Sequence, residues 1–276
     1  MQTKSWKILK RVLFLLFTVY LGILLGLYVF QRSQVFHPAI DKKMPAEYGL
    51  NKFENLIITT SDNTKVQLWY KKAKPGYPTV VYFPGNAYSL GNRAHRFKEI
   101  SEKGFGVIGV SYRGYGQSEG SPSEPGLYDD ARAAMSYATT KLSIPSRQMI
   151  LYGESLGTAV ATFVATEYAV GGLILEAPPL SILARGQELY PYIPVSWLLK
   201  DTFPTIDRIG KIHTPLLIMH GDADRVVPVE HGRSLYKAAE KPKKIIIFKG
   251  IHHIDIPAER VAKEIDRFAE HFHLTE

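Results

Sequence analysis

The sequence predicts an α/β protein with a mostly parallel, doubly wound sheet and a short cap, preceded by one N-terminal transmembrane helix. Two observations support this prediction. Apolar runs of strand length alternate with helix-like segments over residues 55–272, and the first thirty residues contain a long run without any charge. Alternating strands and helices favour a parallel sheet whose helices cover both faces.

The N-terminal apolar run covers residues 12–30 and reads VLFLLFTVYLGILLGLYVF, 19 residues without a charged side chain. A helix of roughly 20 apolar residues spans a bilayer. A cleaved signal peptide has a shorter apolar core of about 7–15 residues and a small-residue cleavage site, and residues 31–36 (QRSQVF) offer no such site. We therefore expect an uncleaved signal anchor rather than a signal peptide or a buried core helix.

The charge distribution supports the same interpretation. Of the formal net charge of +8, four charges come from Lys4, Lys7, Lys10 and Arg11, which leaves +4 for residues 12–276. Basic residues before a span favour a cytoplasmic N-terminus, so we expect residues 1–11 in the cytoplasm and the globular part outside it. The excess charge is then a topology signal, and no basic patch interleaved with aromatic residues indicates nucleic-acid binding.

The composition excludes several classes of protein. A hydrophobic content of 45% is too high for a disordered chain. The absence of cysteine excludes disulfides, thiolate zinc sites and a cysteine nucleophile. A nucleophile, if the chain has one, must be of another type.

After a linker at residues 31–53, we expect one globular domain over residues 54–276. Several of its apolar runs (VVYF, VIGV, LILE, LLIM, IIIF) are typical of parallel strands buried on both faces. Residues 178–210 lack the clear hydrophobic period of a helix or strand and are predicted to form the short cap. The first two strands have no helix between them and should form a hairpin at the sheet edge. The predicted strands are 55–60, 66–71, 79–83, 106–111, 148–152, 173–176, 215–219 and 244–248, and the predicted helices are 93–103, 127–142, 156–169, 229–239 and 258–272.

Two segments match the G-x-S-x-G pattern of a nucleophilic serine, residues 116–120 (GQSEG) and 153–157 (GESLG). The pattern works when a strand precedes the serine and a helix follows it directly. Ser118 is followed by SPSEP at residues 121–125, which cannot open a helix directly. Ser155 follows the apolar run MILY and precedes TAVAT, so we predict Ser155 as the nucleophile and Ser118 as a loop residue.

A serine nucleophile needs a base, and the base needs an acid that orients it. In this architecture, the acid and then the histidine should each follow a later strand. Residues 220–228 (HGDADRVVP) offer Asp224 as the acid, with Asp222 as the second choice, and residues 249–255 (KGIHHID) offer His252 or His253 as the base. The chain order Ser, Asp, His is the reason to read these residues together.

An oxyanion hole on this architecture uses the backbone N–H after the nucleophile and another from an earlier strand-to-helix loop. Leu156 supplies the first. The loop FPGNAY at residues 83–88 supplies the second through Asn86, or less favourably Ala87. A plain Pro-Gly turn is the alternative interpretation of this loop.

Two other patterns resemble known binding motifs only formally. Residues 104–109 match G-x-G-x-x-G but lead into a strand instead of opening a helix, so no dinucleotide is expected. The His and Asp residues of 220–224 and 252–255 lack the helical H-x-x-x-H spacing of a zinc site. We expect neither a metal nor an organic cofactor.

The chain resembles the serine α/β-hydrolases of the Bem46-like group, close to the serine aminopeptidase-like, S33-type group. The resemblance covers most of residues 54–272 and rests on FPGNAYSLGNR (83–93), SYRGYGQSEGSPSEPGLYDDA (111–131), YGESLGTAVA (152–161), HGDADRVVP (220–228) and GIHHID (250–255). It implies the α/β-hydrolase fold for residues 54–276, assigns catalytic roles to Ser155 and Asp224, and selects His253 over His252. Pro84 and Ser111 depart from the family's usual His and Asp, outside the triad.

The expected activity is that of a membrane-anchored serine hydrolase acting on ester, thioester or, less favoured, amide bonds of a small-molecule or acylated substrate. The alternatives are a catalytically silent hydrolase fold that serves as a binding module, and an acyltransferase using the same triad. The apolar cap residues, among them Leu180, Ile182, Leu183, Tyr190 and Trp197, suit an acyl chain, but packing onto the core is the preferred reading. The oligomeric state is not indicated.

Overall fold

The computed structural model describes the backbone of residues 2–275 and the side chains of residues 5–275. Within this part of the chain an eight-stranded sheet has the order β10-β9-β8-β7-β4-β6-β3-β2. The strands are β2 (Glu54–Thr59), β3 (Lys65–Lys71), β4 (Thr79–Phe83), β6 (Gly106–Ser111), β7 (Met149–Glu154), β8 (Gly172–Glu176), β9 (Leu216–Gly221) and β10 (Lys243–Phe248).

The sheet is mostly parallel. Strands β6, β4, β7, β8, β9 and β10 pair in parallel, whereas β3 is antiparallel to both β2 and β6. The hairpin predicted from the first two strands is therefore confirmed, and it lies at the edge of the sheet. The parallel central strands β4, β6, β7, β8 and β9 are buried along their whole length, which explains their continuous apolar runs.

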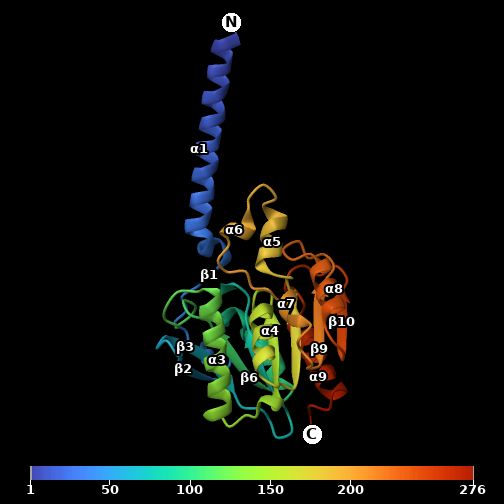
Figure 1. Ribbon diagram of the computed structural model, residues 1–276. Helices are drawn as coiled ribbons and strands as arrows, with labels where there is room; N and C mark the ends of the chain where they lie inside the picture. The colour runs from blue at the N-terminus through green and yellow to red at the C-terminus, as the bar shows by residue number, and fades with distance from the viewer. Residues whose placement is uncertain (1, 276) are drawn as a thin grey trace.

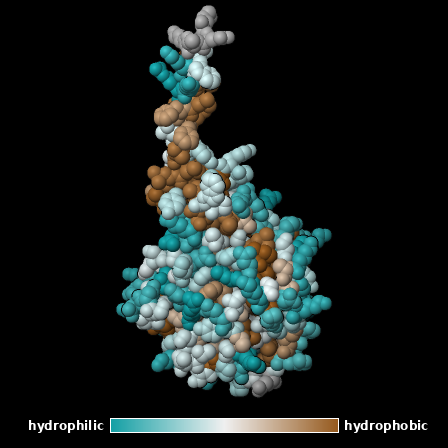
Figure 2. All heavy atoms as spheres, in the orientation of Figure 1, coloured by the Kyte–Doolittle hydropathy of each residue, from teal (hydrophilic) through white to brown (hydrophobic). Residues whose placement is uncertain are grey.

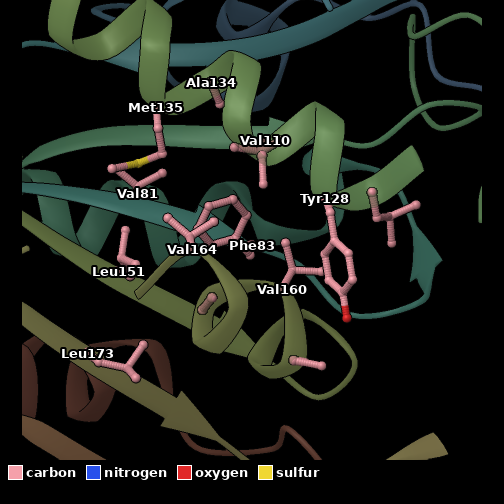
Figure 3. Close-up of a cluster of buried hydrophobic side chains, with 14 of the residues drawn as sticks. Val81, Phe83, Val110, Tyr128, Ala134, Met135, Leu151, Val160, Val164 and Leu173 are labelled. Atoms are coloured by element: carbon pink, nitrogen blue, oxygen red, sulfur yellow. The ribbon is translucent and has the colours of Figure 1, made fainter. Parts of the chain in front are cut away.

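Helices cover both faces of the sheet, as the alternation of elements predicts (Figure 1). On one face, α2 (Ala94–Glu102) and α9 (Ala258–His271) pack on side chains such as Val80 and Tyr82. On the other, α3 (Glu124–Thr140), α4 (Gly157–Glu167) and α8 (Val229–Ala238) pack on Val81 and its neighbours. Figure 3 shows this second core, where Met135 of α3 and Val164 of α4 meet strand side chains. The α/β architecture is confirmed, with helix bounds within a few residues of those predicted.

The N-terminal helix α1 (Gln2–Val35) is one continuous helix that projects from the domain (Figure 1). It runs past residue 30 and joins the domain directly. Phe36 and Leu50 are buried, and β1 (His37–Pro38) pairs with β5 (Ala87–Tyr88). Residues 36–50 thus pack against the globular part.

The cap lies between β8 and β9 and contains α5 (Ile182–Leu189), α6 (Val195–Leu198) and α7 (Ile206–Ile209). The buried carboxylate of Asp201 fixes its base. Asp201 accepts hydrogen bonds from the Glu124 N–H at 2.8 Å and from Nε of Arg32 at 2.8 Å. Because Arg32 belongs to α1, this carboxylate joins the N-terminal helix, the cap and α3.

Candidate active site

Ser155 lies on a sharp turn between β7 and α4. Its φ is +51°, a left-handed conformation that non-glycine residues rarely adopt. The glycines on either side permit this close turn, because a Cβ on Gly157 would lie 2.0 Å from the Phe83 carbonyl oxygen and one on Gly153 would lie 2.5 Å from the Thr158 Cα. The strand, turn and helix predicted around Ser155 are therefore present.

Three side chains from separate loops meet at this turn. His253 Nε2 lies 2.9 Å from Ser155 Oγ, and His253 Nδ1 lies 2.7 Å from Asp224 Oδ2. Asp224 follows β9 and His253 follows β10, so parallel pairing brings both loops to the same sheet edge as the Ser155 turn. Because the Asp224 carboxylate accepts a hydrogen bond from Nδ1–H, Nε2 keeps a lone pair that can accept the proton of Ser155.

The alternatives that the sequence left open lie elsewhere. His252 contacts the Ala223 carbonyl oxygen through Nδ1 at 2.9 Å. Asp222 accepts a hydrogen bond of 2.6 Å from the Gly250 N–H and so caps a turn. Ser118 is a buried loop residue, since its hydroxyl donates to the Ser111 carbonyl at 2.8 Å and accepts from the Gln67 N–H at 2.9 Å.

The Asp224 carboxylate is held by several donors. Its Oδ1 accepts hydrogen bonds from the Val226 and Val227 N–H groups at 2.8 and 2.9 Å. Burial acts to raise the pKa of Asp224, but hydrogen bonds from His220, His253 and the Val227 N–H outweigh it and hold the pKa well below its usual range. The Asp224 carboxylate therefore stays ionised at neutral pH.

His220 is a further histidine at Asp224 that the sequence analysis did not assign. It is fully buried, with Nε2 at 2.9 Å from the Val227 carbonyl and 3.4 Å from Asp224 Oδ2. Both neighbours accept, so Nε2 carries the proton. Its Nδ1 has no hydrogen-bond partner among the described residues.

The two predicted oxyanion donors flank the nucleophile. Leu156 and Asn86 both line the same cavity as Ser155, and neither N–H has a protein acceptor within the described chain. Asn86 is fixed from two sides, because its carbonyl accepts from Tyr115 Oη at 2.7 Å and its side-chain amide donates to the Val35 carbonyl at 2.5 Å. These contacts hold Asn86 at the cavity wall.

Two buried ion pairs support the site from below. Glu154, the residue before Ser155, pairs with Arg93 at 2.5 Å and accepts from the Gly85 N–H at 3.4 Å. Burial acts to raise the pKa of Glu154, yet the charges of Arg93 and Arg96 lower it. Arg96 pairs with buried Glu176 and donates to the Ile254 carbonyl at 2.7 Å. The first pair holds the loop at residues 83–88, and the second holds the loop that contains His253.

Sequence reasoning missed these pairs. One feature of the sequence does indicate an ion pair at Glu154 and at Glu176. Each is an acid at the end of an otherwise apolar strand, and such an acid needs a buried cation. Nothing in the sequence identifies Arg93 and Arg96 as the partners.

A cavity of about 320 Å³ opens beside Ser155. Its lining is mostly apolar and comes from three parts of the chain: Leu27 and Val35 of α1, Ile182 and Leu198 of the cap, and Val227 of the Asp224 loop. The cap residues differ in their environments. Tyr190 lines the cavity and Leu180 packs on the core, whereas Trp197 is 86% exposed. Packing onto the core therefore does not account for all of them.

The family model described as "Serine aminopeptidase, S33" matches residues 77–207 and 198–259. The chain belongs to this family. An uncharacterised protein of Mycobacterium tuberculosis H37Rv is 32% identical over 236 residues, covering 85% of this chain and 84% of that protein. The resemblance stated from the motifs is thereby confirmed, including its S33-type assignment.

Two other matches carry functional names. The lysophosphatidylserine lipase ABHD12 of Danio rerio is 29% identical over 245 residues, covering 75% of this chain and 64% of the lipase. Among solved structures, the Pyrococcus furiosus esterase Pf2001 has a TM-score of 0.70 at 18% identity, covering 86% of this chain and 97% of the esterase. The structural likeness shows the α/β-hydrolase fold, and the chain is an α/β-hydrolase of an esterase- and lipase-like family.

Proposed function

We propose that this protein is a membrane-anchored serine hydrolase that cleaves carboxylic esters or thioesters through Ser155, His253 and Asp224. One observation carries the proposal: His253 lies 2.9 Å from Ser155 Oγ through Nε2 and 2.7 Å from Asp224 through Nδ1. A nucleophile, a base and an orienting acid in this relation are the elements of acyl transfer. The named lipase and esterase matches support ester bonds over amides.

The proposed reaction has two halves. In the first, His253 Nε2 takes the Ser155 proton as Oγ bonds to the substrate carbonyl carbon, and the Leu156 and Asn86 N–H groups stabilise the oxyanion. His253 then gives the proton to the leaving alcohol or thiol as its bond to the carbonyl carbon breaks. In the second, water attacks the acyl-enzyme, and His253 passes the water's proton to Ser155. The reaction consumes one water and releases a carboxylic acid.

Labelling with a fluorophosphonate probe tests the nucleophile. Ser155→Ala should abolish labelling, whereas Ser118→Ala, in the other motif, should retain it. His252→Ala should keep activity and His253→Ala should lose it. A folded wild-type protein that the probe does not label would favour a silent binding module, and persistent labelling of Ser155→Ala would contradict the assignment.

A substrate panel tests the bond class. Hydrolysis of p-nitrophenyl esters of increasing chain length, beside aminoacyl amides, separates esterase from peptidase activity. Preference for the amides would overturn the proposal. Product analysis with a competing alcohol separates hydrolysis from acyl transfer to another acceptor.

The proposed anchor is the apolar part of α1 at residues 12–30, with residues 1–11 in the cytoplasm and the hydrolase domain, residues 54–276 with the cap at 178–210, outside it. The helix is long and apolar enough to cross a membrane, and none of its most apolar window is buried in the protein. The wild-type chain has no cysteine, so a single introduced thiol reports position without background. An impermeant maleimide on intact cells should label Lys249→Cys and leave Lys7→Cys unlabelled, and the reverse pattern would invert the topology.

A further inference from the structure

The outer end of the cap presents an apolar surface to solvent. Residues 189–199 read LYPYIPVSWLL and contain no charged side chain. Tyr192 is 88% exposed and Trp197 is 86% exposed, and Leu189 and Tyr190 are also exposed. We call residues 189–199 the cap tip. Exposed aromatic side chains in an uncharged segment are typical of surfaces that contact another apolar phase.

The cap tip lies beside the apolar part of α1. The hydroxyl of Tyr20 donates to the Tyr192 carbonyl at 2.7 Å, and Gln31 Nε2 donates to the Leu198 carbonyl at 3.1 Å. Tyr20 lies ten residues before Phe30, where the apolar run ends, which corresponds to about 15 Å along a helix. A bilayer core is about 30 Å thick. If residues 12–30 cross that core, the cap tip lies within the leaflet next to the hydrolase domain.

Much of the cap-tip backbone is hydrogen-bonded within the protein, which suits an environment with little water. Main-chain polar groups in lipid need partners within the protein. The Tyr190, Ile193, Val195, Trp197 and Leu199 N–H groups donate to nearby carbonyls, and Pro191 and Pro194 have no N–H. Side chains of α1 bond to further main-chain groups. Tyr20 and Gln31 donate to the Tyr192 and Leu198 carbonyls, and Gln31 Oε1 accepts from the Lys200 N–H at 2.7 Å.

Charged groups mark the lower limit of this apolar surface. The Arg32–Asp201 ion pair of 2.8 Å joins the end of α1 to the base of the cap, and Lys200 Nζ lies 4.2 Å from the Tyr28 ring centroid. Figure 2 shows brown, hydrophobic residues along α1 down to its junction with the cap, and mostly teal and white residues below that level. Aromatic rings beside basic groups are the side chains found where a membrane meets water.

From these observations we propose that the cap tip inserts into the leaflet next to the hydrolase domain, and that the Ser155 cavity receives an acyl chain directly from that leaflet, between α1 and the cap. The cavity wall supports this route, because Leu27 and Gln31 of α1 face the same space as Ile193 and Leu198 of the cap and as Ser155. The inference rests on the anchor and the nucleophile of the proposed function, and it identifies the lipid bilayer as the partner of the cap tip.

Tryptophan quenching in membranes tests the insertion. The chain has three tryptophans, of which Trp69 is buried in the domain, so full-length Trp6→Phe leaves Trp197 as the exposed one. This variant is reconstituted in phosphatidylcholine vesicles whose acyl chains carry bromine near the carbonyl or near the chain end. We expect strong quenching, greater for bromine near the carbonyl, and its loss in Trp6→Phe/Trp197→Phe. Fluorescence of Trp197 unaffected by either lipid would overturn the proposal.

Activity on two substrates separates this proposal from the proposed function. Neither Tyr192 nor Trp197 lines the cavity, so Tyr192→Ser/Trp197→Ser should keep wild-type hydrolysis of p-nitrophenyl butyrate in detergent. Its hydrolysis of monooleoylglycerol embedded in phosphatidylcholine vesicles should fall at least about tenfold. Ile57→Ser replaces an exposed apolar residue on β2, away from the cap tip; it is the control and should change neither rate.

The possible outcomes are distinct. An equal loss on both substrates, or no loss on the embedded lipid, contradicts loading from the leaflet. A wild-type protein that fluorophosphonate does not label, yet whose Trp197 is quenched by brominated lipid, contradicts the proposed hydrolase while leaving the membrane contact intact. Protection of Trp197 by a second copy of the chain, seen as quenching that is absent at high protein density and appears on dilution, would assign the cap tip to a protein interface instead.

Discussion

The guanidinium of Arg96 donates a hydrogen bond of 2.7 Å to the main-chain carbonyl of Ile254, the residue that follows His253. Ile254 has a φ of +52°, so the loop turns sharply next to the candidate base. Arg96 also forms an ion pair with Glu176, and both side chains are buried. A charged residue of α2 therefore fixes a loop that lies more than 150 positions later in the chain.

Removing Arg96 should impair both stability and turnover. Arg96→Met leaves the Glu176 carboxylate buried without its cation, which costs about 3–5 kcal/mol, and it frees the His253 loop. The double variant Arg96→Met/Glu176→Gln removes that stranded charge. We expect the melting temperature to recover in the double variant while kcat stays at least about tenfold low. Recovery of kcat together with the melting temperature would show that Arg96 is only structural.

Replacing the acid should leave the protein folded and nearly inactive. Asp224→Asn removes the carboxylate that holds the Nδ1 proton of His253, and loss of an orienting acid in serine hydrolases costs about 10⁴ in kcat. Asp222→Asn is the matched control, because Asp222 only caps a turn through Gly250. Steady-state hydrolysis of p-nitrophenyl butyrate measures both variants. A comparable loss in the two would reject Asp224 as the specific partner of His253.

A methyl group at Gly157 should disturb the oxyanion loop. Alanine there would place its Cβ 2.0 Å from the Phe83 carbonyl oxygen and 2.4 Å from that of Pro84, so the turn at Gly157 and the backbone before Asn86 must move apart. Loss of one oxyanion donor costs about 10²–10³ in kcat, and we expect Gly157→Ala to reach that range. Gly22→Ala meets no atom within 4 Å and should be silent. Near-normal kcat for Gly157→Ala would exclude Asn86 as a donor.

The buried Asp130 should make stability depend on pH. Burial raises its pKa to about 6, although Arg113 acts to lower it through hydrogen bonds of 2.7 and 2.9 Å. Because the folded-state pKa lies above the model-peptide value of 3.8, the folded state binds more protons between these pH values, and stability falls as pH rises from about 4 to about 6. The pKa difference corresponds to about 3 kcal/mol.

Asp130→Asn removes this titration. Thermal unfolding of both proteins in detergent measures this effect. The melting temperature of the wild type should rise relative to that of Asp130→Asn as the pH is lowered from 7 to 5, whatever their difference at neutral pH. A wild-type melting temperature that stays constant relative to Asp130→Asn over this range, or falls relative to it on acidification, would mean that Asp130 is ionised throughout.

The sequence predicts the central strands and the helices because burial on both faces leaves long apolar runs, as in VVYF at residues 80–83 and LLIM at 216–219. It also predicts that Ser155, Asp224 and one histidine of the pair at 252–253 converge, since each follows its own strand and parallel strands end at one edge. The residues alone leave His252 and His253 open, and the resemblance to the family selects His253, with which the distances in the structure agree.

Contacts between distant segments produce no comparable pattern in the sequence. The pairs Arg93–Glu154 and Arg96–Glu176 join residues 61 and 80 positions apart, and no local period records a partner at that range. The contribution of α1 to the cavity is also invisible in the sequence. Leu27 belongs to a uniformly apolar run, in which a side chain that faces lipid and one that faces a cavity are the same residue type.

The continuity of α1 with the cavity wall has a consequence for proteolytic release. A protease that cut the chain after Phe30 would free the globular part, but it would also remove Leu27 from the cavity lining and the Tyr20 hydroxyl from the cap. The shed fragment would keep Ser155, Asp224 and His253 with one side of the cavity open to water. If residues 12–30 are the proposed anchor and Ser155 is the proposed nucleophile, shedding would therefore change the selectivity of the enzyme as well as release it.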